Sequence, residues 1–106
     1  MTDTDRVADA LSTYGEIVTR FSRLRIDSAR AVSPGVVEIA VTVPDQPALR
    51  VKWIQHLTTS ADTAIPITTA LISEARETGR FPDTGHWSYD SSTNRWTPVD
   101  ADAFGS

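Results

Sequence analysis

The sequence predicts an α+β domain built as a two-layer sandwich, in which two helices cover one face of an antiparallel sheet. Three observations support this prediction. Apolar residues recur every three or four positions in two segments, which is typical of amphipathic helices. Between these segments apolar and polar residues alternate, as in half-buried strands, and turn residues separate the alternating runs. The predicted order is α-β-β-β-α-β-β, an antiparallel meander and two helices followed by a C-terminal hairpin.

The first helix is expected over residues 4–23, because apolar side chains form one stripe there. Thr2, Asp3 or Thr4 can cap its start. Gly15 falls inside the predicted helix, where glycine costs up to about 1 kcal/mol relative to alanine. The apolar stripe consists of Val7, Ala10, Leu11, Tyr14, Ile17, Val18 and Phe21.

Three strands are expected next, each with one buried face. The first covers residues 24–32, and the segments VVEIAVTV and ALRVKWIQHL supply the other two. The turns SPG and PDQP separate them. The predicted buried positions are Val37, Ile39, Val41, Val43, Leu49, Val51, Trp53 and Leu57. The opposite face of the third strand is expected to carry Arg50, Lys52, Ile54 and His56.

A second helix is expected over residues 66–78, with Pro66 in its first turn and Gly79 at its end. Its predicted buried face holds Ile67, Ala70, Leu71, Ile72, Glu74 and Ala75. The final hairpin pairs Asp90 with Arg95 across the loop SSTN. This register places on one face Trp87, Tyr89, Trp96 and Pro98.

Composition indicates one domain over residues 1–99 and a flexible tail over residues 100–106, since 106 residues allow one core. Without cysteine there is no disulfide or thiolate nucleophile. The apolar runs are too short for a membrane span, and MTDTDR is unlike a signal peptide, so a cytoplasmic protein is predicted. The net charge of −4 disfavours sequence-independent binding of nucleic acid.

The order of the first five elements resembles that of double-stranded-RNA-binding domains, and the whole order resembles secretion-chaperone-like folds. In the RNA-binding family a basic cluster opens the second helix and contacts phosphates. Here that helix begins IPITTALISEAR, with no lysine and with its first arginine near the end. Because a shared order implies a fold and not a function, no residue roles are carried over from either family.

The tripeptide Asp83-Thr84-Gly85 resembles the sequence around the catalytic carboxylate of aspartic proteases. That chemistry needs the aspartate on a rigid loop after a buried strand, with apolar residues before it and a small residue after the glycine. Here Phe81-Pro82 precede the tripeptide and a histidine follows it. Proline cannot donate a sheet hydrogen bond, and Pro-Asp-x-Gly is typical of turns. We therefore interpret the tripeptide as a turn.

Motifs for metals, phosphates and nucleophilic catalysis are missing. His56 and His86 stand thirty positions apart, with no HExxH or EF-hand spacing around them. The glycines form neither a Walker nor a dinucleotide-binding pattern, and no nucleophile-elbow motif is present. We predict no catalytic residue, no metal site and no cofactor.

Two surfaces remain as candidate binding sites. The interaction candidates are aromatic or apolar residues, which dominate hot spots of protein interfaces; they are Ile54, Trp87, Tyr89 and Trp96. Covering the core is the favoured role for the three aromatic residues. The basic-face candidates are Arg25, Arg50, Lys52 and His56. A solvated sheet face with Asp27 and Glu38 as partners is the simpler interpretation of that cluster.

The leading hypothesis is a non-enzymatic protein-interaction domain: an adaptor, an inhibitor or a chaperone-like subunit, with homodimerisation left open. Its expected partner is another protein. The alternative is binding of a small molecule or a nucleic acid through the face of Arg50, Lys52 and His56. A third hypothesis is a dimeric aspartic hydrolase that uses Asp83.

Overall fold

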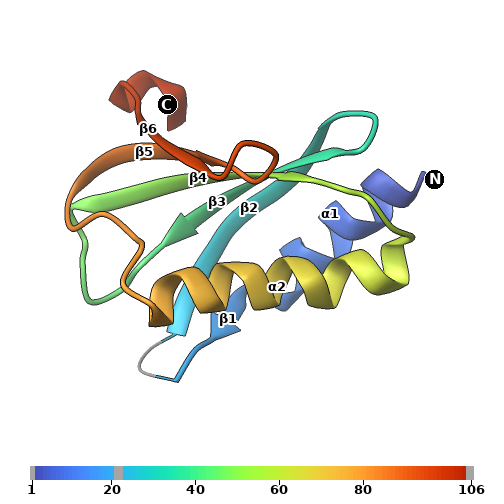
Figure 1. The fold of residues 1–106 in the computed structure, drawn as a ribbon, viewed down its shortest axis with the longest axis horizontal. Coiled ribbons are helices and arrows are strands. Elements are labelled where there is room, and N and C mark those ends of the chain that lie inside the picture. Colours follow the sequence, from blue (N-terminus) through green and yellow to red (C-terminus); the bar gives the residue numbers. More distant parts are fainter. Residues whose placement is uncertain (1, 21–22, 105–106) are drawn as a thin grey trace.

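The computed structural model describes residues 2–20 and 23–104, without the side chains of residues 103 and 104. Within these residues, two helices lie against one face of a sheet of six strands (Figure 1). The element order is α-β-β-β-β-α-β-β. The predicted α+β class is confirmed, with one more strand than expected.

The strands are ordered in the sheet as they follow one another in the chain, and the sheet is not closed. They are β1 (Glu16–Val18), β2 (Arg23–Ser33), β3 (Val36–Thr42), β4 (Leu49–His56), β5 (Gly85–Asp90) and β6 (Arg95–Pro98). Neighbouring strands are antiparallel except β4 and β5, which are parallel. A parallel pair needs a crossover connection, and helix α2 (Ala61–Glu77) supplies it.

Helix α1 (Asp3–Tyr14) is shorter than predicted. Thr2 caps its start by accepting a hydrogen bond from the amide of Asp5 at 3.2 Å. Gly15 ends it with φ at 71°, a left-handed conformation in which a residue without Cβ is not strained. The prediction of a helix to residue 23 is therefore wrong, because the following residues form strand β1. Phe21, the last member of the predicted stripe, lies outside the described residues.

Helix α2 begins before its predicted start, so Pro66 lies inside the helix and not in its first turn. Its buried face also differs from the prediction, because Ile67 is 41% exposed while Thr68 is fully buried. The hydroxyl of Thr68 donates to the carbonyl of Ala64 at 2.7 Å, so burial leaves this polar group satisfied. The observed face consists of Ala61, Ala64, Thr68, Ile72 and Ala75. Gly79, with φ at 74°, ends the helix as predicted.

The predicted inward faces of β3 and β4 are confirmed. Each predicted inward position from Val37 to Trp53 is at most 1% exposed. Leu57, just beyond β4, is partly buried against the core. On the helix side the core is completed by Val7 and Leu11 of α1 and by Ile72 of α2. A single apolar layer between sheet and helices therefore stabilises the domain.

The hairpin of β5 and β6 has the predicted register, with Asp90 opposite Arg95 and Tyr89 opposite Trp96. Because β5 pairs with β4, these aromatic rings reach Trp53. The ring centroids of Trp53 and Tyr89 lie 4.1 Å apart, and those of Tyr89 and Trp96 lie 5.0 Å apart. After β6, the 3-10 helix η1 (Ala101–Phe104) forms part of the predicted tail, and residues 105 and 106 lie outside the described residues.

We predict that Val41→Asp prevents folding, because it places an unpaired charge in the core. Ala40→Asp is the matched control, since Ala40 lies on the other face and pairs with Lys52. It should change the free energy of unfolding by about 0.5 kcal/mol or less. Circular dichroism during a thermal melt checks both variants. Equal behaviour would contradict the assignment of Val41 and Ala40 to a buried and an exposed face.

We predict that Trp96→Ala lowers the free energy of unfolding by about 2–4 kcal/mol, toward the lower end for large aromatic residues because Trp96 is partly exposed. Arg95→Ala, on the opposite face of the same strand, should cost about 0–1 kcal/mol. Urea denaturation measures both. An unchanged midpoint for Trp96→Ala would mean that this ring does not stabilise the core.

Candidate functional site

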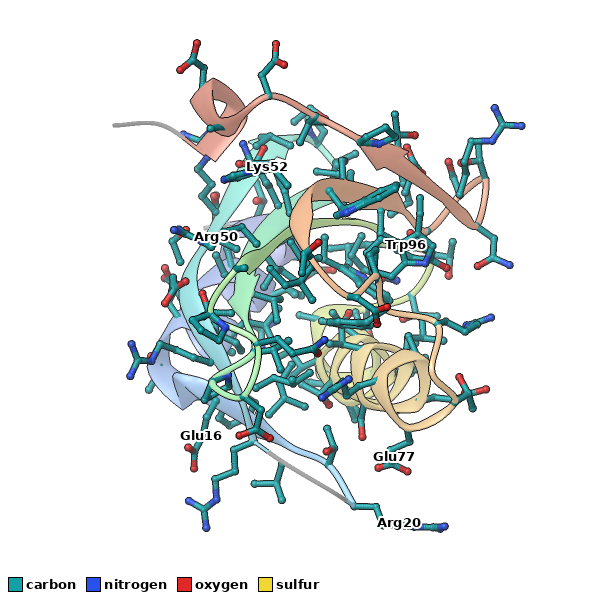
Figure 2. All side chains as sticks on the ribbon, turned by 90° about the vertical axis from the view of Figure 1, so that its left-hand side faces the viewer. Glu16, Arg20, Arg50, Lys52, Glu77 and Trp96 are labelled. Carbon is teal, nitrogen blue, oxygen red and sulfur yellow. The ribbon has the colours of Figure 1, made fainter. Side chains whose placement is uncertain are left out.

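The face of the sheet turned away from the helices, here called the outer face, carries all four basic-face candidates. Arg25 and Arg50 both pair with Thr42, one from each side. Lys52 and His56 follow Arg50 at alternate positions of β4, with Ile54 between them. Figure 2 shows Arg50 and Lys52 on the side of the sheet away from α2.

Carboxylates are interleaved with these cations. Glu38 on β3 lies between β2 and β4, and its Oε1 is 3.3 Å from Nη2 of Arg30 and 3.4 Å from Nζ of Lys52. The side chains of Glu38 and Lys52 are both 17% exposed. The outer face is therefore a mixed ionic surface, in which part of the positive field is neutralised locally.

A second ionic contact joins β4 to the hairpin. Nε2 of His56 lies 3.2 Å from Oδ1 of Asp90, yet this nitrogen makes no aligned hydrogen bond, so we treat the contact as ionic only. The Ser92 hydroxyl donates to the same oxygen at 2.6 Å, and the Ser92 amide does so at 2.8 Å. The Ser92 hydroxyl is the main cause that lowers the pKa of Asp90; partial burial opposes it, and the Ser92 amide and His56 add to the lowering.

The chain bends at Asp83 in the loop between α2 and β5. The side chain of Asp83 is exposed, and its carbonyl accepts a hydrogen bond from Nε2 of Gln46 at 3.1 Å. Gly85 has φ at 102° and donates its amide to the carbonyl of Ala48 at 2.9 Å. Asp83 thus precedes a strand, whereas the protease chemistry needs it after one. In the described part of the chain, no three histidine or carboxylate side chains cluster as metal ligands.

The aromatic candidates of the hairpin face inward more than outward. Tyr89 is 6% exposed, and its hydroxyl donates to Oδ1 of Asn94. Trp87 and Trp96 are partly buried against the core. The indole N–H of Trp87 donates to the carbonyl of Thr84 at 2.8 Å. These contacts commit much of the aromatic surface to the domain itself.

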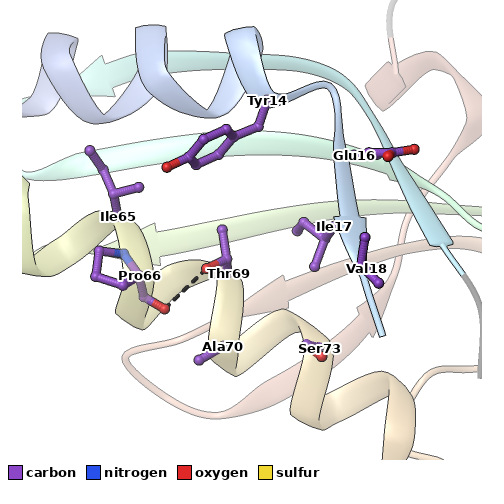
Figure 3. A pocket seen from close by; sticks show the side chains of 9 residues that line it. All are labelled: Tyr14, Glu16, Ile17, Val18, Ile65, Pro66, Thr69, Ala70 and Ser73. Atoms are coloured by element: carbon purple, nitrogen blue, oxygen red, sulfur yellow. Dashed lines mark hydrogen bonds between the residues drawn. The ribbon is translucent and has the colours of Figure 1, made fainter. Parts of the chain in front are cut away.

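A groove that the sequence did not reveal lies between β1 and α2 (Figure 3). Its volume is about 440 Å³. Two of its residues, Tyr14 and Val18, are large apolar side chains with exposed fractions of 58% and 65%. Figure 3 shows Tyr14 extending from the end of α1 toward Ile65 of α2. The lining residues are Tyr14, Glu16, Ile17, Val18, Ile65, Pro66, Thr69, Ala70 and Ser73.

Two local features form the walls of this groove, here called the β1/α2 groove. Gly15 turns the chain from α1 directly into β1, so that Tyr14 and Val18 lie at its two ends. At the Val18 end the amide of Arg20 donates to Oε2 of Glu77 at 2.8 Å, and the Ser73 hydroxyl donates to the same oxygen at 3.1 Å. Figure 2 shows Arg20 and Glu77 at the same end of the molecule. This contact holds α2 beside β1.

No protein-family model, curated protein or solved structure matches this chain. In the residues that the structure describes, neither helix is long and apolar enough to cross a membrane. The surfaces of this molecule are therefore the basis for its proposed function.

The sequence does not predict this groove, because the apolar spacing places Tyr14 and Val18 on one continuous helix. The signal that could have revealed it is Gly15, since glycine after an apolar periodic segment is a common helix stop. The β-branched pair Ile17-Val18 after that glycine is typical of a strand. The α2 side of the groove had no local signal, because Ile65 and Ala70 contribute only through tertiary packing.

We predict that Asp90→Asn lowers the melting temperature near neutral pH and that this difference disappears in acid. Because folding lowers the pKa of Asp90, the ionised carboxylate stabilises the folded state. This stabilisation is complete above the unfolded pKa of about 3.9 and is lost as pH falls through the folded pKa. Melting temperatures of the wild type and of Asp90→Asn, measured from neutral pH down to pH values below the folded pKa of Asp90, check this prediction. Ser92→Ala should show part of the same pH dependence. A difference that persists in acid would contradict the ionic role of Asp90.

Proposed function

We propose that this chain is a protein-interaction domain that binds a partner protein in the β1/α2 groove. The observation that carries the proposal is the gathering of exposed apolar side chains there. Tyr14 and Val18 are large and mostly exposed, and Pro66 and Ala70 of α2 are exposed on the opposite wall. Exposed apolar side chains that gather in one groove, bordered by polar residues, mark a candidate interaction site.

The other candidate surfaces support a binding function less well. On the outer face, Glu38 already lies within ion-pair distance of Lys52, and Asp90 lies beside His56. A ligand for that face must compete with these carboxylates. In the hairpin, Tyr89 is buried and stacks on Trp53, so its ring offers little surface to a partner.

An adaptor, an inhibitor or a chaperone-like subunit fits this proposal, because each acts by holding another protein. We place its action in the cytoplasm, on the ground that a chain without cysteine suits a reducing compartment. Homodimerisation remains an alternative use of the same groove. A dimeric aspartic hydrolase is disfavoured by the exposed position of Asp83 before a strand.

Affinity purification from a lysate of the source organism tests the proposal with two matched variants of α2. Ala70→Arg places a charged side chain in the groove, whereas Thr63→Arg places the same charge on an exposed position outside it. We expect wild type and Thr63→Arg to retain the same protein, and Ala70→Arg to lose it, with equal melting temperatures for all three. A protein retained equally by both variants would contradict the role of the groove.

A further inference from the structure

We draw no further inference here: the strongest candidate, the edge of β1 that borders the β1/α2 groove, carries none, because in the residues that the structure describes nothing shows what covers it.

Discussion

The parallel pairing of β4 with β5 is the constraint on which the rest of the structure depends. All other neighbouring strands are antiparallel and can follow one another through short turns, but this pair requires the chain to cross from one end of the sheet to the other. Helix α2 makes that crossing over the inner face, where it covers the apolar side of the sheet. The same pairing brings the hairpin beside β4, so that Tyr89 stacks on Trp53.

The path of α2 also creates the candidate site. The helix runs past the opposite edge of the sheet, where the amide of Arg20 meets the carboxylate of Glu77. Because β1 is three residues long, this hydrogen bond helps to hold the end of the edge strand beside α2, while Glu16 and Val18 line the groove. An edge that is covered at one end offers fewer unpaired main-chain groups to another sheet than a fully open edge does.

The outer face contributes to the fold more directly than to the proposed binding. Its cations and carboxylates come from neighbouring strands, with Glu38 between Arg30 and Lys52. Cross-strand pairs of opposite charge modestly favour the observed register. Such pairs also interrupt the apolar character that would otherwise make an open sheet face prone to association.

The sequence by itself determined the two-layer class, the inward faces of β3 and β4 and the register of the hairpin. A period of two leaves each strand only one way to bury its apolar side chains, and an error of one residue would expose them all. The sequence did not determine the end of α1, because Ile17 and Val18 continue the helical spacing of apolar residues and are also typical of a strand. The buried face of α2 was missed because Thr68 became a core residue once its hydroxyl bonded the carbonyl of Ala64. Only the tertiary structure decided the parallel pairing and the groove, since each joins segments distant in the chain whose contact leaves no periodic signal in either segment.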